Sequence, residues 1–183
     1  VNSAMMINKL VKNWKKNCLI VWGGPHPTVA PDEVMALPEV SFLVYGEGEH
    51  TMVELVQALE IKKSLAGIKG LYYKDDGGKV FKNQKREYIQ NLDELPFPAR
   101  DMVAKGDIYV PGAYADLMGS RGCPFQCSYC SAYSTWGRKT RYRSIPSIIE
   151  ELRLMKNKYH CEIVRFVDDT LTINRKWVEE LCQ

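Results

Sequence analysis

Apolar and polar positions follow one another along the first third of the chain in an order that predicts alternating strands and helices. Residues 18–24, CLIVWGG, and 41–49, SFLVYGEGE, are short apolar runs that end in glycine-rich turns, as buried strands do. Residues 31–37 predict a short helix, and residues 50–63 predict a longer amphipathic one. Its apolar positions are Met52, Val53, Leu55, Val56 and Leu59. This order predicts an α/β layer with a parallel sheet.

Two further patterns flank this layer. Residues 4–15 predict a helix with one apolar face, because their apolar positions have helical spacing. These positions are Met5, Ile7, Leu10, Val11 and Trp14. Residues 70–82 alternate, turn at Asp76-Gly77-Gly78 and alternate again, which predicts a β-hairpin. Residues 91–101 contain two prolines and little periodicity, and are typical of a linker.

The pattern resumes in the last third of the chain. Residues 115–120 predict a short strand, and residues 144–160 an amphipathic helix capped by Ser144 or Ser147. Residues 162–169 predict a strand that ends in two aspartates. A last helix is expected after Asn174, which is its predicted N-cap.

Composition narrows the class of protein. The chain has 183 residues, of which 45% are hydrophobic and 26% charged, as in soluble globular proteins. No apolar run is long enough to cross a bilayer, and no signal peptide pattern is present, so we expect a cytoplasmic protein. The net charge of +3 is weak, and no lysine and arginine block of the nucleic-acid-binding type occurs. A first residue other than Met, in sequence typical of a domain interior, suggests a fragment.

The richest chemistry lies in residues 118–131, MGSRGCPFQCSYCS. Cys123, Cys127 and Cys130 occur there within a stretch that its glycine, proline and polar neighbours mark as a loop. Thiolates are the soft ligands of iron–sulfur clusters. Three of them leave one iron of a four-iron cube open to another ligand, as catalytic metal sites require. We therefore predict a [4Fe–4S] cluster at these cysteines.

A structural zinc site is the alternative use of the same thiols. Such a site needs four closed ligands. The fourth would be His160 or Cys161, each beyond a predicted helix. The chain would then be a non-enzymatic, zinc-stabilised binding module.

The segment CPFQCSYC, after a strand and before a helix, resembles the cluster loop of the radical S-adenosylmethionine (SAM) superfamily. The resemblance implies a cluster that binds SAM at its open iron and cleaves it to methionine and a 5′-deoxyadenosyl radical. It also implies that Tyr129, the residue before the last cysteine, lies near the adenine. A tyrosine packed within the loop is the alternative.

Two other segments resemble one subgroup of that superfamily. The strand end RFVDDT resembles its DDT variant, which implies that Asp168 or Asp169 accepts hydrogen bonds from the amino group of SAM. The other aspartate would cap the following helix. The segment RYRS places Arg143 and Ser144 at the start of a helix, and a helix-start contact is favoured there over a contact to the SAM carboxylate.

The segments VWGGPHPTVAPDEV and VYGEGEHTMVELV resemble the C-terminal part of the cobalamin-binding domain of B12-dependent radical SAM enzymes. This implies that Gly23 and Gly24 border cobalamin, since glycines let the backbone approach a ligand without a Cβ clash. Glu47 and Glu49 border the same edge, but a glycine-permitted turn is favoured for that segment. His26 is not in the context of a cobalt ligand and is expected to be a loop residue.

These resemblances predict an α/β protein of three parts. Residues 1–64 are the C-terminal part of a Rossmann-like cobalamin-binding domain, 65–113 a β-hairpin and linker, and 114–183 the first unit or units of a radical SAM partial (β/α) barrel. The predicted function is that of a radical SAM enzyme with cobalamin as methyl carrier, a methyltransferase or a related radical enzyme. A radical SAM methylthiotransferase is the nearest enzyme alternative. Expected partners are an unidentified small-molecule substrate and an electron donor such as flavodoxin or ferredoxin, with no nucleic acid and no membrane.

Overall fold

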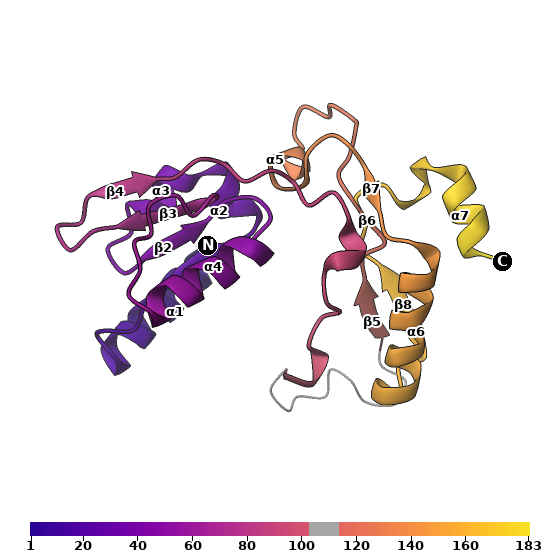
Figure 1. Ribbon diagram of the computed structural model, residues 1–183, viewed down its shortest axis with the longest axis horizontal. Coiled ribbons are helices and arrows are strands. Elements are labelled where there is room, and N and C mark those ends of the chain that lie inside the picture. Colours follow the sequence, from indigo (N-terminus) through magenta and orange to yellow (C-terminus); the bar gives the residue numbers. More distant parts are fainter. Residues whose placement is uncertain (103–113) are drawn as a thin grey trace. The chain divides into compact units, whose positions relative to one another are not determined.

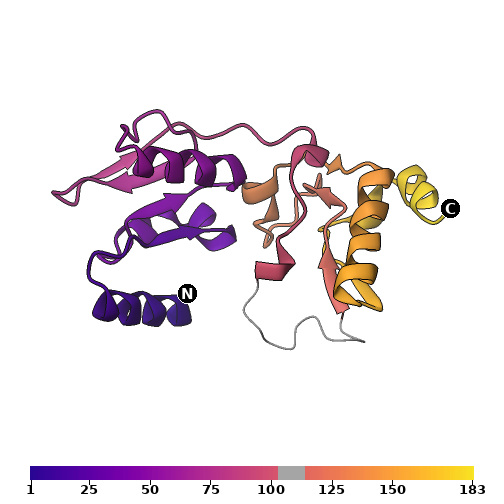
Figure 2. The same cartoon turned by 60° about the horizontal axis from the view of Figure 1, so that its bottom comes forward.

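The computed structural model describes residues 1–102 and 114–183 and contains two compact units (Figures 1 and 2). The first comprises Val1–Tyr88 and Gln126–Trp136, and the second comprises the described parts of Ile89–Phe125 with Gly137–Gln183. The end of the predicted linker, residues 103–113, lies outside the described residues. The predicted α/β class is confirmed, since both units combine helices with parallel strand pairs.

A four-stranded sheet forms the centre of the first unit, in the order β1-β2-β3-β4. Strand β2 pairs in parallel with β1, and β3 and β4 continue the sheet as an antiparallel hairpin. The bounds are β1 (Val21–Gly23), β2 (Phe42–Val44), β3 (Leu71–Lys74) and β4 (Val80–Lys82). The predicted hairpin is therefore present, and it extends the same sheet because the backbone of β3 hydrogen-bonds to the free edge of β2.

Five helices belong to the first unit within the described residues. They are α1 (Asn2–Trp14), α2 (Pro25–Val29), α3 (Pro31–Met35), α4 (Glu49–Glu60) and α5 (Ala132–Trp136). Helices α2 and α5 were not predicted from the sequence, because five-residue helices carry too few apolar positions to show a helical period.

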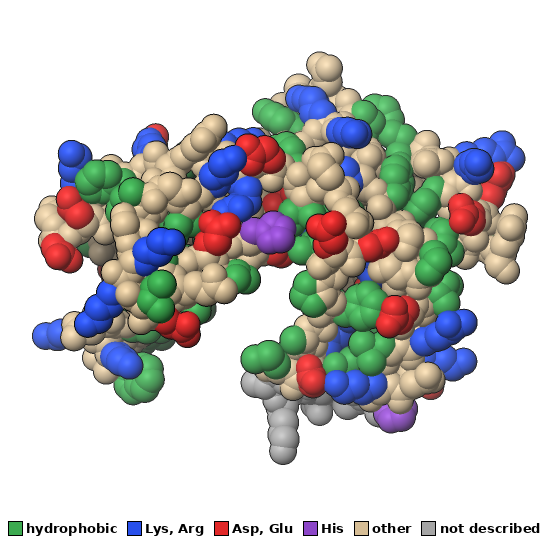
Figure 3. Space-filling model, viewed as in Figure 1, with side chains coloured by type: hydrophobic (Ala, Val, Ile, Leu, Met, Phe, Trp, Pro, Cys, Tyr) green, Lys and Arg blue, Asp and Glu red, His purple; other side chains and the backbone are tan. Residues whose placement is uncertain are grey.

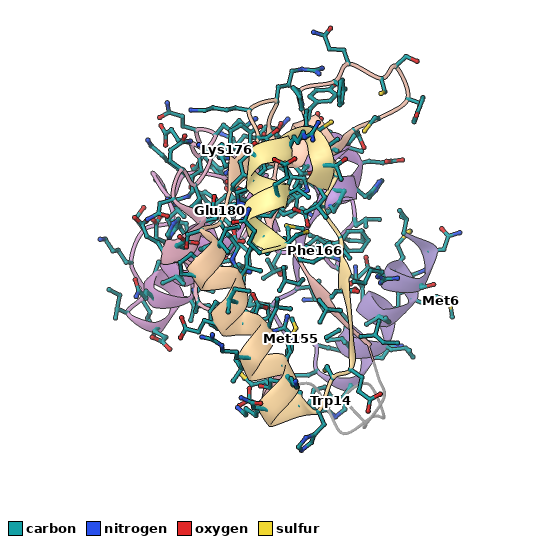
Figure 4. The ribbon with its side chains drawn as sticks, turned by 90° about the vertical axis from the view of Figure 1, so that its right-hand side faces the viewer. Met6, Trp14, Met155, Phe166, Lys176 and Glu180 are labelled. Atoms are coloured by element: carbon teal, nitrogen blue, oxygen red, sulfur yellow. The ribbon has the colours of Figure 1, made fainter. Side chains whose placement is uncertain are left out.

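The predicted apolar faces of α1 and α4 were wrong in part. Helix α1 packs Ala4, Met5 and Val11 against the core, with the buried Asn8 accepting a hydrogen bond from Trp22 Nε1 at 3.1 Å. A polar residue at the middle of the buried face shifts that face around the helix. Three residues of the predicted face, Ile7, Leu10 and Trp14, are exposed, and Figure 4 shows Trp14 projecting from α1.

Helix α4 buries Thr51, Leu55 and Ala58, while Val53 and Val56 are exposed. The threonine is buried because its Oγ1 donates to the carbonyl of Lys69 at 2.8 Å and accepts from Arg86 Nε at 2.9 Å. A hydroxyl with two partners can be buried without the penalty of an unmade hydrogen bond. This tertiary contact rotates the buried face away from the most apolar positions.

The second unit is built around a β-α-β arrangement. Strands β5 (Tyr114–Leu117) and β8 (Ile163–Phe166) are parallel, and α6 (Ile145–Tyr159) lies between them in the chain. Met155 of α6 and Phe166 of β8 contribute to its core (Figure 4). Lys156 and Lys158 of α6 are exposed, and Figure 3 shows basic side chains on the outer surface of this unit. The remaining elements are η1 (Leu92–Glu94), η2 (Arg100–Met102), β6 (Ser120–Arg121), β7 (Arg141–Tyr142), η4 (Leu171–Ile173) and α7 (Arg175–Leu181).

The predicted caps of the last two long helices are confirmed. Ser144 Oγ accepts from the backbone of Ser147 at 3.3 Å and caps α6, so Ser144 and not Ser147 is the N-cap. Asn174 Oδ1 accepts from the backbone of Trp177 at 3.2 Å and caps α7. Both side chains satisfy amide groups that a helix start leaves without a partner.

A buried ion pair network fixes α6 within the second unit. Glu151 of α6 accepts from Arg100 Nη2 at 2.6 Å and is also paired with Arg143 Nη1. Glu151 and Arg100 are almost wholly buried, and Arg143, whose side chain is 12% exposed, also stacks on the ring of Phe97. The network therefore connects the start of α6 to the segment that precedes β5.

Candidate functional site

A pocket of about 300 Å³ opens at the carboxyl ends of β1 and β2 in the first unit. Gly23 and Gly24 line one side, and Gly46 and Gly48 line the neighbouring turn. Gly24 and Gly46 have φ of +98° and +75°, a backbone region that favours glycine, and a Cβ at either position would meet open space. The carboxyl edge of parallel strands is where doubly wound sheets bind their ligands.

Thr28 of α2 holds the two glycine turns together. Its Oγ1 donates to the carbonyl of Gly24 at 2.8 Å and accepts from the amide of Gly46 at 3.1 Å. The residue is buried, so these bonds are shielded from water. The pocket rim is thus preorganised by a side chain that the sequence reading did not single out.

The two glutamates of the second turn also line the pocket. Glu47 is almost wholly buried, and Glu49 begins α4. The sequence reading favoured a turn role for this segment, and the structure places both residues at the pocket as well. His26 lies in α2 near Glu33, with 3.8 Å between Nε2 and Oε2, and is not among the pocket residues.

The cysteine loop starts from a close backbone crossing. Gly122 has φ of +98°, and a Cβ there would lie 2.4 Å from the carbonyl oxygen of Lys139. The amide of Cys123 donates to the carbonyl of Gly137 at 3.2 Å, and that of Cys130 to the carbonyl of Cys127 at 3.2 Å. Glycine is favoured at the crossing, because any side chain would meet backbone atoms and force the backbone to shift.

All three cysteines of the loop are free thiols, with Cys127 exposed and Cys123 and Cys130 half-buried. Within residues 1–102 and 114–183, no three His, Cys, Asp or Glu side chains are grouped closely enough to hold a metal ion. Tyr129 is 91% exposed, so the alternative of a tyrosine packed within the loop is wrong for this structure. Its ring is accessible to a ligand.

The two aspartates after β8 differ in their hydrogen bonds. The carboxylate of Asp168 accepts from the amides of Gly119, at 3.0 Å, and Ser120, and from Ser120 Oγ at 2.6 Å. It therefore ties the end of β8 to the turn that precedes the cysteine loop. Asp169 makes no such bonds within the described residues, and partial burial, followed by the charge of Asp168, raises the pKa of its carboxyl.

Neither aspartate caps the next helix, because Asn174 does so for α7. The helix-cap alternative for one of the two is thus replaced by the turn contact of Asp168. Asp169 is the carboxylate left available to a cation. It receives no hydrogen bond from the described residues and is still partly open to solvent, so it can accept bonds from an ammonium group.

The favoured helix-start role of Arg143 and Ser144 is confirmed. Ser144 caps α6, and its own amide donates to Asp93 Oδ1 at 3.0 Å. Arg143 pairs with Glu151, and its Nη2 donates to Ser147 Oγ at 3.0 Å. Because the guanidinium of Arg143 already has these partners within the second unit, the geometry gives no support for a contact to a SAM carboxylate.

The fourth ligand required by the zinc alternative is not near the cysteine loop within the second unit. Cys161 is 6% exposed and packs in the core with Met155 and Leu117. His160 ends α6 and precedes the amino end of β8, whereas Cys123 follows the carboxyl end of β5. Since β5 and β8 are parallel, His160 and Cys123 lie beyond opposite ends of the strand pair.

The sequence reading missed Thr135 and Trp136 of α5. Both line the pocket, from the helix that follows the cysteine loop, although they lie more than 85 residues from the nearest pocket turn in the chain. The only hint in the sequence is a threonine and a tryptophan side by side, a few residues after Cys130. Nothing in a local pattern connects that pair with turns so far upstream.

Comparisons with known proteins agree with the motif. Residues 117–183 match the radical SAM superfamily. An uncharacterized methyltransferase of Pyrococcus horikoshii is 40% identical over 94% of this chain, and the aligned region is 38% of that protein. An anaerobic magnesium-protoporphyrin IX monomethyl ester cyclase of Synechocystis is 28% identical over 91% of this chain, which is 34% of the cyclase. The chain thus spans little more than a third of the length of these relatives.

The fold matches a solved structure over almost the whole chain. It superposes with a TM-score of 0.77 and 17% identity on the radical SAM methyltransferase TsrM from Kitasatospora setae, a structure with cobalamin and a [4Fe–4S] cluster bound. The match covers 98% of this chain and 36% of that one. In the part of the chain that the structure describes, no helix combines the length and apolar character needed to cross a bilayer.

Proposed function

Because residues 117–183 match the radical SAM superfamily, we propose that the chain carries the cluster and cobalamin sites of a cobalamin-dependent radical SAM methyltransferase. The observation that carries the proposal is the Cys-x3-Cys-x2-Cys loop, in a β-α-β unit that matches the superfamily. The glycine-turn pocket at the end of β1 and β2 supports the cobalamin part. So does the likeness of the fold to a cobalamin-bound methyltransferase.

The residue types and their spacing in the chain fit the implied groups, although the three thiols are not grouped around a metal ion in the structure. Cys123, Cys127 and Cys130 supply three thiolates for a [4Fe–4S] cluster, the donor set that such clusters take. Gly23 and Gly24 border a pocket whose rim leaves room for close approach of a ligand. When bound, the cluster supplies an electron for the cleavage of SAM, and cobalamin supplies a carrier for the methyl group.

The protein groups have the task of binding and orienting SAM. The ionised carboxylate of Asp169 accepts hydrogen bonds from its ammonium, while Asp168 fixes the turn that leads into the cysteine loop. Tyr129, whose ring is exposed, is the proposed contact to the adenine. An external one-electron donor of the flavodoxin or ferredoxin type completes the system. We place the protein in the cytoplasm.

Metal and cofactor analysis tests this proposal. After anaerobic reconstitution of the protein, we expect about four irons and four sulfides per chain, the stoichiometry of a thiolate-ligated cube. We also expect bound cobalamin and formation of methionine and 5′-deoxyadenosine on reduction with SAM. A Cys127→Ala variant should lose the cluster, whereas Cys18→Ala, outside the motif, should keep it. One zinc per chain without iron would overturn the proposal.

Ring closure is a second candidate reaction, favoured by the likeness to the magnesium-protoporphyrin ester cyclase. The two reactions differ in the fate of the SAM methyl group. With SAM labelled in that methyl, a methyltransferase places the label in the product. A cyclase leaves it in methionine. The substrate of either reaction is a small molecule that the present residues do not identify.

A further inference from the structure

Helix α1 has an apolar stripe on its outer side. Figure 2 shows this helix along one side of the sheet of the first unit, and its inner side contacts the core through Ala4, Asn8 and Val11. Four large apolar side chains on the other side are 58–83% exposed: Met6, Ile7, Leu10 and Trp14. Their spacing places them on one helix face, and the described residues leave this face open to solvent.

The charges on α1 and directly after it are all positive. Lys9, Lys15 and Lys16 are exposed, and Lys12 is half-buried. No acidic residue occurs in the sequence before Asp32. A partner that covers the stripe therefore meets apolar side chains and positive charges next to one another, and an anionic surface with an apolar layer beneath it complements both.

Helix α4 of the same unit provides a comparison. It also exposes apolar side chains, since Val53 is 56% and Val56 46% exposed. This helix contains three acidic residues and no lysine: Glu49, Glu54 and Glu60. Of the two long helices of the first unit, only α1 therefore combines exposed apolar residues with positive charge.

A helix with tryptophan and leucine on one side and lysines beside them is typical of helices that lie in the plane of a membrane surface. The apolar side chains enter the boundary between headgroups and acyl chains, where tryptophan is favoured, and the lysines contact headgroup phosphates. We propose that α1 binds the protein to a bilayer surface that contains anionic phospholipid. A second copy of the chain fits less well, because it would bring the lysines of two helices together.

Surface binding of this kind needs no apolar run that crosses a bilayer. The expectation of no membrane partner came from the absence of such a run, whereas a helix in the membrane plane needs only one apolar side. The cytoplasmic leaflet carries the anionic lipids, which agrees with the location proposed above. Binding to a bilayer requires neither the cluster nor cobalamin.

Co-sedimentation of the protein with lipid vesicles tests the proposal without an activity assay. One vesicle is phosphatidylcholine alone, and in the other about a third of the lipid is phosphatidylglycerol. We expect binding to the second vesicle only, and its loss at about 0.5 M salt, which screens the lysines. Leu10→Gln with Trp14→Gln should weaken binding about tenfold or more. Lys9→Gln with Lys16→Gln should weaken it about fivefold for each charge removed.

Two double variants are matched controls and should bind as the unsubstituted protein does. Val53→Gln with Val56→Gln removes exposed apolar side chains from α4, and Lys62→Gln with Lys63→Gln removes the same charge elsewhere in the unit. Circular dichroism checks the fold of each variant, and the salt dependence of the unsubstituted protein remains a test if a variant does not fold.

Three outcomes overturn the inference. The first is equal binding to neutral and anionic vesicles, and the second is an equal loss in the control variants. The third is no binding to anionic vesicles. If the α1 variant then disperses oligomers of the unsubstituted protein, a second copy and not a membrane covers the stripe.

Discussion

The two aspartates at the end of β8 have different contacts, and single substitutions should separate their proposed roles. Asp168→Asn removes a charge-assisted hydrogen-bond acceptor from Gly119 and Ser120, so we expect it to destabilise the protein by about 1–3 kcal/mol in chemical denaturation. Asp169→Asn should leave stability intact and weaken SAM binding in calorimetry. A stable Asp168→Asn together with normal SAM affinity in Asp169→Asn would contradict this assignment.

The raised pKa of Asp169 gives a second test at the same position. Partial burial and the neighbouring charge of Asp168 favour the protonated carboxyl, so its ionisation opposes folding as the pH rises through this pKa. In its proposed role, Asp169 must be ionised to accept hydrogen bonds from the ammonium of SAM. SAM affinity should therefore fall with decreasing pH earlier than for an ordinary aspartate. Asp169→Asn should lose this component of the pH profile, and an identical profile in the variant would refute the role of Asp169.

Gly122 tests the base of the cysteine loop. Gly122→Ala would place a Cβ against the backbone of Lys139, and the loop must shift to accommodate it. We expect fewer irons per chain after reconstitution. Gly78→Ala is the matched control: Gly78 also has positive φ, +80°, but a Cβ there meets no atom within 4 Å. Equal iron loss in both variants would mean that backbone strain, about 1–2 kcal/mol, and not the close crossing, is the cause.

For individual residues, the sequence predicts which residue types belong to the candidate site better than it predicts the contacts that each residue makes. The cysteine spacing and the paired aspartates are visible in the motif itself. The division between Asp168 and Asp169 is not, because it depends on contacts to Gly119 and Ser120, about 50 residues upstream. The pocket role of Thr135 depends on a similar long-range contact.

At the scale of elements, Glu151 shows how a buried charge fixes a helix. Glu151→Gln would leave Arg100 and Arg143 buried with an uncharged partner, and breaking such a network costs about 3–5 kcal/mol. We expect a corresponding fall in the denaturation midpoint, measured by chemical denaturation. Glu150→Gln, exposed on the same helix, is the control and should change stability by less than about 0.5 kcal/mol. Equal effects of the two would mean that the network does not stabilise the unit.

The positions of the strands and helices were largely predictable from the sequence. Glycines mark the ends of the strands, and capping residues mark the starts of the helices. The buried faces of the helices were less predictable. In α1 the buried Asn8, and in α4 the buried Thr51, take positions that hydrophobicity alone assigns to solvent. Each is buried because a partner distant in the sequence forms a hydrogen bond with its polar group. The local pattern of hydrophobic residues does not include that partner.

At the scale of the whole molecule, the fold was predictable as an α/β protein, but the packing of residues 126–136 in the first unit was not. The expected parts were continuous stretches of sequence. The structure instead places residues 126–136 in the first unit and their flanks in the second. The reason is tertiary: α5 packs against α2, and no periodicity in five residues predicts where a short helix docks.

The apolar surface of α1 leads to a prediction for the chain as a whole. Met6, Ile7, Leu10 and Trp14 are 58–83% exposed on a helix whose opposite side packs in the core, and Figure 4 shows Met6 on the outer side of α1. Contiguous exposed apolar surface of this kind promotes association. The 183-residue chain alone should therefore form oligomers whose size grows with concentration in light scattering.

Two double variants distinguish this surface from a general effect of charge. Ile7→Lys with Leu10→Lys should yield monomers, because the introduced charges resist desolvation at an interface. Asn13→Lys with Asn17→Lys adds the same charge at exposed polar positions and should leave the oligomers in place. If both pairs abolish association, net repulsion rather than the apolar face controls it. A monodisperse monomer of the unsubstituted chain at high concentration would show that the apolar side of α1 tolerates water without a covering partner.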